Sequence, residues 1–361
     1  MSAVDQTRTV RPGEELDVRI VEQYLLERVA GLQAPLEITQ FPGGASNLTY
    51  LLKFGNRELV LRRPPPGRKA KSAHDMGREF QVMQGLRRFY PYVPEMVVFC
   101  DNEEVIGSEF YVMERLQGII LRTDLPAGLH LTATDCTRLC RGMIDRLVEL
   151  HKVRWSETPL HPLYRKGDYV ERQITGWTDR YVKARTPDVP SCSAVMTWLQ
   201  THRPAQIDQC LVHNDYRFDN LVLSAANPMD IIGVLDWEMA TIGDPLMDLG
   251  NSLAYWVERD DPPELQLMRR QPSNLPGMLS RRELVALYLQ QSGWQDKGLS
   301  ADQFDFYLIY GVFRLVVIMQ QIYYRYYHGQ TRDQRFAGFV DIINYLDSHL
   351  QNRIAESRLR P

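Results

Sequence analysis

The spacing of apolar and polar positions divides the chain into two parts with different secondary structure. In the first part, short runs rich in apolar and β-branched residues stop at turn-forming residues, such as Gly55-Asn56. This pattern is typical of antiparallel strands joined by tight turns. One longer segment follows the capping-box-like sequence Ser72-Ala73-His74-Asp75 and repeats its apolar residues at helical spacing. The elements expected here are helices over residues 18–29 and 73–89 and strands over residues 36–41, 48–54, 58–62, 95–99 and 109–114.

Beyond Gly118 the apolar residues recur at helical spacing over long segments, most clearly over residues 134–153. Two short apolar runs, at residues 221–223 and 231–235, interrupt the helical pattern once and are typical of strands. The predicted fold class is therefore α+β, in two lobes. A small lobe with an antiparallel sheet is expected over residues 1–116, and a large, mainly helical lobe over residues 117–361. A chain of 361 residues exceeds the usual size of one hydrophobic core, in agreement with this division.

The composition is that of a globular protein, with 44% hydrophobic and 24% charged residues. A formal net charge of −3 argues against a nucleic-acid partner, because such proteins usually carry a basic face. The five cysteines leave one unpaired in any disulfide scheme and lack zinc-binding spacing, which favours reduced thiols in a cytoplasm. The first residues lack the apolar core of a signal peptide, and the most apolar late run is interrupted by Arg314. We therefore expect a cytoplasmic protein with no membrane partner.

The segment from His213 to Asn220 has the spacing His-x-Asp followed by four residues and Asn, just before an apolar strand. Phosphoryl transfer requires a group that orients the acceptor hydroxyl and takes up its proton, and ligands for the metal ions that neutralise the nucleotide phosphates. Asp215 is the candidate for the first task, and the amide oxygen of Asn220 is a candidate Mg²⁺ ligand. His213 is interpreted as a structural histidine that supports this loop.

A second candidate metal ligand, Asp236, follows the apolar run at residues 231–235. Magnesium prefers oxygen ligands and needs few protein carboxylates when substrate phosphates complete its coordination. Asp236, Asn220 and the phosphates of ATP therefore make a chemically complete site. The alternative is that Asp236 is an ordinary turn residue.

The loop, the sequence Asp236-Trp237-Glu238 and the sequence Gly243-Asp244-Pro245 followed by Asp248-Leu249 resemble the aminoglycoside phosphotransferase family, an offshoot of the protein-kinase fold. The resemblance extends over residues 36–350 and implies a two-lobed, ATP-dependent kinase of small molecules. It also implies that Arg217 contacts the transferring phosphoryl group, with a structural ion pair as the alternative. Asp244 and Asp248 are expected to serve structure, by capping a helix and tying the loop to the helical lobe.

In the first lobe the resemblance implies a nucleotide site. Val60 and Arg62 alternate along one strand, so they share a face, where Val60 would cover adenine and Arg62 would reach a phosphate. Glu79 is the expected partner of Arg62, and an exposed helix charge is the alternative. The remaining candidates lie in two segments that also suit an ordinary turn and an ordinary linker. They are Gly44, Ser46 and Asn47 over the phosphates, and Met113, Glu114 and Leu116 beside the adenine edge.

The acceptor is less constrained, because a fold does not specify a substrate. The late helical region carries Arg314, Arg325, Arg332 and Arg335 among many tyrosines, which favours an anionic acceptor over a polycationic aminoglycoside. The sequences of these motifs resemble those of the subgroup associated with acyl-CoA dehydrogenase-like proteins. This resemblance implies a hydroxyacyl-CoA as the acceptor. An aminoglycoside or choline-like kinase and a non-catalytic nucleotide-binding regulatory protein are the alternatives. A homodimer and the use of GTP stay open.

Overall fold

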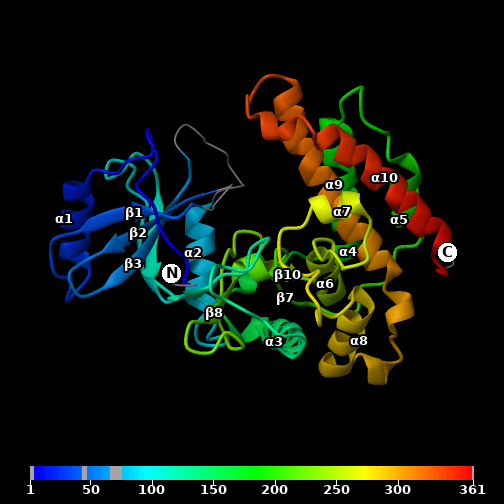
Figure 1. Cartoon of the computed structure of the whole chain (residues 1–361), viewed down its shortest axis with the longest axis horizontal. Coiled ribbons are helices and arrows are strands. Elements are labelled where there is room, and N and C mark those ends of the chain that lie inside the picture. Colours follow the sequence, from blue (N-terminus) through cyan, green and yellow to red (C-terminus); the bar gives the residue numbers. More distant parts are fainter. Residues whose placement is uncertain (1–3, 43–46, 66–74, 360–361) are drawn as a thin grey trace.

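The computed structural model describes residues 4–42, 47–65 and 75–359, and it has two lobes (Figure 1). The small lobe is built on a five-stranded sheet in the order β1-β2-β3-β5-β4, in which every neighbouring pair is antiparallel. The predicted candidates Gly44 and Ser46 lie outside the described residues. The elements of this lobe are α1 (Val18–Arg28), β1 (Glu37–Gln40), β2 (Leu48–Lys53), β3 (Glu58–Arg63), α2 (Met76–Leu86), β4 (Met96–Cys100) and β5 (Phe110–Glu114).

The two faces of this sheet serve different cores. Leu59 and Leu61 of β3 belong to a cluster that includes the buried residues of α1, whereas Val60 belongs to the large core that includes α2. The alternation along a strand therefore places Val60 on the opposite face from α1. The side chain of Asp75 accepts a hydrogen bond from the backbone N–H of Arg78 at 2.8 Å and begins α2. Part of the predicted helix at residues 73–89 lies outside the described residues, and α2 ends earlier, at Leu86.

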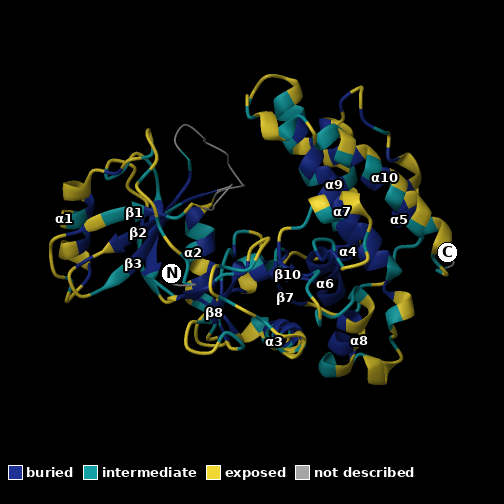
Figure 2. Cartoon of the chain, viewed as in Figure 1, coloured by how far each residue is buried: buried dark blue, intermediate teal, exposed yellow. Residues whose placement is uncertain are grey.

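The large lobe is mainly helical, and its buried residues form one core with α2 and one face of the sheet (Figure 2). The structure differs from the expectation of a single interruption, because a two-stranded sheet, β7 with β10, is present beside the three-stranded sheet β6-β8-β9. β7 and β10 are too short for an alternation of apolar and polar residues to reveal them in the sequence. The elements are β6 (Gly118–Ile119), α3 (Ala133–His151), α4 (Tyr169–Ala184), α5 (Ser193–Thr201), β7 (Cys210–Val212), β8 (Leu221–Ser224), β9 (Ile231–Val234), β10 (Thr241–Gly243), α6 (Pro245–Leu253), α7 (Pro263–Leu267), α8 (Arg281–Ser292), α9 (Asp305–Tyr327) and α10 (Phe339–Glu356).

The short strands position two loops side by side. β7 pairs with β10, so that Val212 lies opposite Thr241, and β8 pairs with β9, so that Leu221 lies opposite Val234. The loop between β7 and β8 and the turn between β9 and β10 therefore begin and end on paired strands. This arrangement brings residues 213–220 next to residues 235–240.

Helix α9 is the centre of the helical lobe, where it packs against α6, α10 and α4. It is long and apolar enough to cross a membrane by length and composition, and it is the one such helix in the described part of the chain, but 83% of its most apolar window is buried inside the protein. It approaches α6 very closely at two glycines. A Cβ on Gly250 would lie 2.3 Å from the carbonyl oxygen of Tyr307, and a Cβ on Gly311 would lie 2.2 Å from that of Gly250.

Candidate active site

The loop between β7 and β8 brings three of the predicted site residues together. Oδ2 of Asp215 accepts hydrogen bonds from Nδ2 of Asn220 at 3.0 Å and from Nη2 of Arg217 at 3.1 Å. The same Nδ2 of Asn220 also donates to the backbone carbonyl of Asp215 at 2.8 Å. No described residue donates to Oδ1 of Asp215, and its side chain keeps 22% exposure. One carboxylate oxygen is thus held and the other faces open space.

His213 joins this loop to the neighbouring turn. Its Nε2 lies 3.0 Å from the carbonyl oxygen of Leu235, and its Nδ1 accepts from the backbone N–H of Asp215 at 3.2 Å. An acceptor at Nδ1 requires the neutral ring with the proton on Nε2. Burial lowers the pKa of His213, which favours this neutral form. The geometry is that of a residue that positions Asp215.

Asp248 of α6 anchors the start of the loop. Its carboxylate accepts from the backbone N–H groups of His213 at 2.8 Å and Asn214 at 2.7 Å, and it lies 3.1 Å from Nε2 of His151. Burial alone would raise the pKa of Asp248, but the hydrogen bond from His151 and the backbone donors outweigh it, so the pKa is lowered. Asn214 has a positive φ of 65°, a conformation that asparagine tolerates better than most residues. Asp248 thus fixes a strained backbone just before Asp215.

Asp236 lies at the end of β9, beside Asn220. The backbone N–H of the preceding residue, Leu235, donates to the carbonyl of Asn220 at 2.8 Å, so the two candidate metal ligands are linked through Leu235. Oδ1 of Asp236 is 3.2 Å from Nη2 of Arg62, so the small lobe contributes a cation to this corner. Asp236 has a positive φ of 69°, which turns its side chain sharply at the strand end.

Arg62 is shared between two carboxylates. Its Nη1 donates to Oε1 of Glu79 at 2.7 Å, while its Nη2 reaches Asp236. Glu79 is fully buried, so the alternative of an exposed helix charge is wrong. The same Oε1 also accepts from the backbone N–H of Trp237 at 3.1 Å. Burial alone would lower the pKa of Arg62, but the negative charge of Glu79 outweighs it and holds that pKa well above the ordinary value.

The predicted adenine contacts lie where the lobes join. Val60 and Met113 are paired across β3 and β5 and are buried. The backbone N–H of Glu114 already donates to the carbonyl of Glu95 at 2.8 Å, and its side chain forms an ion pair with Arg57. A nucleotide contact at Glu114 would therefore have to use its carbonyl. The side chain of Leu116 packs tightly over Gly233 of β9.

Two residues that sequence reasoning missed complete the site. Oε2 of Glu238 accepts from Nδ2 of Asn47 at 3.0 Å, which joins the predicted phosphate loop to the turn after Asp236. Burial, and then the charge of Asp236, raise the pKa of Glu238 to about 8. Tyr255 is the second: the guanidinium of Arg217 lies over its ring, 4.2 Å from the centroid. Glu238 stood within a recognised motif, but no spacing distinguished Tyr255.

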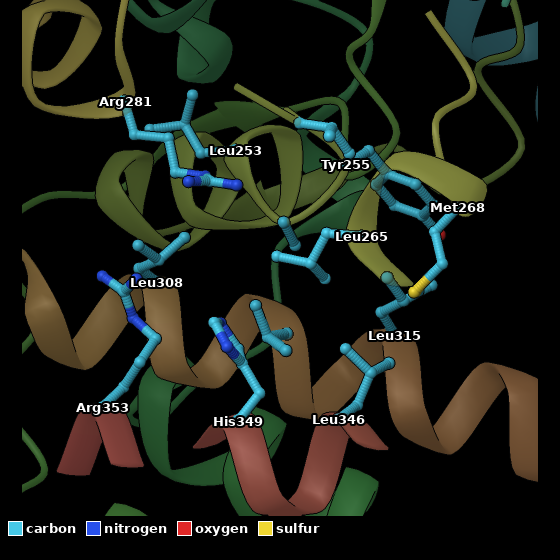
Figure 3. Close-up of a pocket in the computed structure, with 13 residues that line it drawn as sticks. Leu253, Tyr255, Leu265, Met268, Arg281, Leu308, Leu315, Leu346, His349 and Arg353 are labelled. Atoms are coloured by element: carbon cyan, nitrogen blue, oxygen red, sulfur yellow. The ribbon is translucent and has the colours of Figure 1, made fainter. Parts of the chain in front are cut away.

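Tyr255 also borders a mainly apolar pocket between α6, α7, α9 and α10 (Figure 3). Tyr255 and Met268 lie at one end of the pocket, while Arg281, His349 and Arg353 gather toward the other. About 30 Å³ of it admits the centre of a water molecule, which is room for one or two waters. In this conformation the pocket is too small for an organic substrate.

The family model for the phosphotransferase enzyme family matches residues 37–284, which include every candidate catalytic and metal-binding residue described above. The chain belongs to this family. It is therefore a small-molecule phosphotransferase with a hydroxyl group as acceptor.

Relatives of the phosphotransferase include parts of longer proteins. Mouse acyl-CoA dehydrogenase family member 10 is 33% identical over 331 residues, which cover 91% of this chain and 30% of that protein. Human acyl-CoA dehydrogenase family member 11 is 32% identical over 345 residues, which cover 93% of this chain and 43% of that protein. The chain therefore spans less than half the length of these relatives.

Solved structures agree with the expected two-lobed, protein-kinase-like fold. A putative aminoglycoside phosphotransferase from Ralstonia eutropha JMP134 superposes with a TM-score of 0.78 at 26% identity, covering 95% of this chain and 100% of that one. Choline kinase from Cryptosporidium parvum Iowa II gives a TM-score of 0.65 at 13% identity, covering 94% of this chain and 96% of that one. At this lower identity the likeness concerns the fold alone.

The phosphotransferase family implies a nucleotide and a divalent metal, and the oxygen atoms at Asn220 and Asp236 suit Mg²⁺. Because Nδ2 of Asn220 is used by Asp215, its Oδ1 points elsewhere and receives no hydrogen bond from the described residues. Oδ2 of Asp236 is likewise left without a donor in the described part of the chain. Within those residues no group of three or more His, Cys, Asp or Glu could hold a metal, so phosphate oxygens would have to complete the coordination.

Proposed function

We propose that this phosphotransferase transfers the γ-phosphoryl group of ATP to a hydroxyl group of a small molecule, with Asp215 accepting the hydroxyl proton. The observation that carries the proposal is the direct connection of the candidate residues. Asp215 bonds to Asn220, the carbonyl of Asn220 bonds to the residue before Asp236, and Asp236 bonds to Arg62 of the other lobe. The proposed base, the two proposed metal ligands and the proposed phosphate-binding cation are thus joined by one chain of contacts, which supports the proposal.

In the proposed reaction, Oδ1 of Asp215 accepts the O–H of the acceptor and orients its oxygen toward the γ-phosphorus. The oxygen–phosphorus bond forms as the bond between the γ-phosphorus and the β,γ-bridging oxygen breaks, the proton passes to Asp215, and ADP leaves. Arg217 and Asn220 hold the other carboxylate oxygen in place, so the base needs no reorientation during the step.

Asn220 and Asp236 would hold Mg²⁺, which neutralises charge on the phosphates when it is bound. Arg62 is placed by Glu79 so that its second amino group points at the same corner. A guanidinium that is fixed at this position can stabilise the negative charge on the phosphate oxygens during the transfer. Arg217, which bonds to Asp215 and lies over the ring of Tyr255, is the second such cation.

For the acceptor we propose a hydroxyacyl-CoA. The support is the similarity of this chain to segments of proteins named acyl-CoA dehydrogenase family members. An amino alcohol or an aminoglycoside is the second candidate, favoured by the fold that the chain shares with choline kinase. A regulatory protein that binds a nucleotide without turnover is the third, and the retention of Asp215, Asn220 and Asp236 argues against it.

One experiment separates these candidates. The protein is incubated with ATP, Mg²⁺ and a panel of hydroxyacyl-CoA thioesters, amino alcohols and aminoglycosides, and products that gain a phosphoryl group are detected by mass. The proposal expects phosphorylated thioesters and none with Asp215→Ala. Phosphorylated amines alone would favour the second candidate, and tight ATP binding without any product would favour the third.

A further inference from the structure

Arg314 of α9 is a deeply buried cation with no hydrogen-bond partner among the described residues. Arg314 is only 4% exposed, and none of the ion pairs in the described part of the chain involves it. Of the other arginines predicted to favour an anionic acceptor, Arg335 is exposed and paired with Asp333, and Arg332 is exposed. Arg325, near the end of α9, is half-buried, so Arg314 is the most deeply buried of the four.

Aromatic side chains surround Arg314. Its guanidinium carbon lies 5.1 Å from the centroid of Trp177 on α4. Tyr310, one turn earlier on α9, is buried beside it, and the positive charge of Arg314 opposes the rise that burial causes in the pKa of Tyr310. Cation–π contacts of this kind offset only part of the cost of removing a charge from water, and no nitrogen of Arg314 is among the described side-chain atoms that are fully enclosed without a partner.

The charge of Arg314 also acts on Tyr255, the residue whose ring contacts the catalytic loop through Arg217. Burial raises the pKa of Tyr255, and the charges of Arg217 and Arg314 both oppose that rise, so both cations act on one phenol group. Arg217 lies over that ring and bonds to Asp215. Tyr169 of α4 is a second link, because the charge of Arg314 also opposes the rise that burial causes in the pKa of Tyr169, whose hydroxyl donates to Oδ1 of Asn214 in the catalytic loop at 3.2 Å.

We propose that Arg314 binds an anionic group of the acceptor, while Trp177 packs against its guanidinium. This inference rests on the proposed function, and it narrows the acceptor to hydroxy compounds that carry a carboxylate or a phosphate at a distance from the reacting hydroxyl. A guanidinium suits either group, because its fork of N–H donors matches both geometries. A cationic amino alcohol would be repelled from the same position.

Binding is measured by calorimetry with matched probes, so that the result does not depend on turnover. The probes are 3-hydroxybutyrate, 3-hydroxyhexanoate, their uncharged amides and their CoA thioesters. Wild-type protein is expected to bind at least one anionic probe about 10- to 100-fold more tightly than the matched amide, the range of a charged hydrogen bond. A preference for free acids identifies a carboxylate as the anion, and a preference for thioesters identifies a CoA phosphate.

Arg314→Gln should abolish this preference and leave the affinity for the amide unchanged, while Arg314→Lys should retain part of it. The matched control is Arg180→Gln, because Arg180 is exposed but contacts the same indole, 4.6 Å from its centroid. ATP affinity and the urea midpoint are measured for each variant, to separate a loss of fold from a loss of anion binding.

Three results would overturn the inference: a wild type that binds no anion in preference to its amide, an Arg314→Gln variant that keeps the preference, or equal losses in the Arg180→Gln control. Anion binding that depends on Arg314 without phosphoryl transfer to any probe would count against the proposed function instead. Phosphoryl transfer to a cationic acceptor that is indifferent to Arg314 would keep the phosphotransferase and reject the anion site.

Discussion

Arg62 and Asp236 are 174 positions apart in the sequence, yet their side chains form an ion pair across the two lobes at 3.2 Å. Glu79 binds the other amino group of the same guanidinium at 2.7 Å. This ion pair is therefore one of several contacts that hold the small lobe over the candidate metal site, together with the hydrogen bonds from Asn47 to Glu238 and from the backbone of Trp237 to Glu79.

Replacing Glu79 by alanine is expected to lower the free energy of unfolding by about 3–5 kcal/mol, because it leaves the buried Arg62 without its main partner. Glu114→Ala is the matched control, since it removes a partly exposed Arg57 partner in the same lobe, and about 1 kcal/mol or less is expected there. Urea unfolding curves of both variants make the comparison. Equal losses would show that burial does not distinguish the two pairs.

Asp215→Asn should lower kcat by about 100-fold or more, because it removes the proton acceptor while keeping hydrogen bonds from Arg217 and Asn220 possible. The dissociation constant for ATP should stay within about 2-fold, since no nucleotide contact is assigned to Asp215. Asp230→Asn, at the exposed turn before β9, controls for the loss of a carboxylate. Near-normal turnover by Asp215→Asn would remove Asp215 as the base.

Gly250→Ala and Gly311→Ala should each destabilise the protein by about 1–3 kcal/mol or more, because the added Cβ would overlap backbone atoms of the opposite helix. Helix propensity alone predicts the opposite sign, by about 1 kcal/mol in favour of alanine. Gly142→Ala in α3 separates the two effects, because its nearest neighbour would be a side-chain atom at 3.7 Å. That variant should be neutral or stabilised in thermal unfolding.

His213 should make the protein less stable in mild acid. Because its folded-state pKa is lowered, the unfolded chain takes up a proton below about pH 6.5 that the folded chain refuses. Its contribution is fully present above that pH and falls by up to about 1.4 kcal/mol per pH unit below it.

The test of this pH dependence is a series of urea unfolding curves between pH 7.5 and 5.5 for wild type and His213→Gln, whose amide can still donate to Leu235. The slope of stability against pH should be smaller in the variant. His161→Gln, at an exposed position, controls for the loss of a histidine at the surface. Identical slopes in wild type and His213→Gln would contradict the prediction.

The residues that could be predicted from the sequence are those whose chemistry depends on residue type and short spacing. The Asp215 to Asn220 spacing fits one loop, and Asp236 follows one strand, so local order alone places each group on its element. The family and the fold class followed from the same motifs and are confirmed. The alternation in β3 likewise predicted the shared face of Val60 and Arg62.

What the sequence did not contain were contacts between distant segments. Tyr255 looks like any packing aromatic until α6 brings it beneath Arg217. The burial of Arg314 depends on α4 and α6 covering one side of α9, whereas Arg335 lies beyond the helix and stays exposed. Helical periodicity did not mark Arg314 as a buried position, because α9 is apolar around nearly its whole circumference.

The central position of α9 also bears on how the chain can be made. Before α10 has been synthesised, α9 lacks part of the surface that buries it. Yet α9 is as long and as apolar as a membrane-spanning helix. A chain that ends before Phe339 is therefore expected to expose apolar surface of α9 and to aggregate, so the native packing of the helical lobe depends on α10.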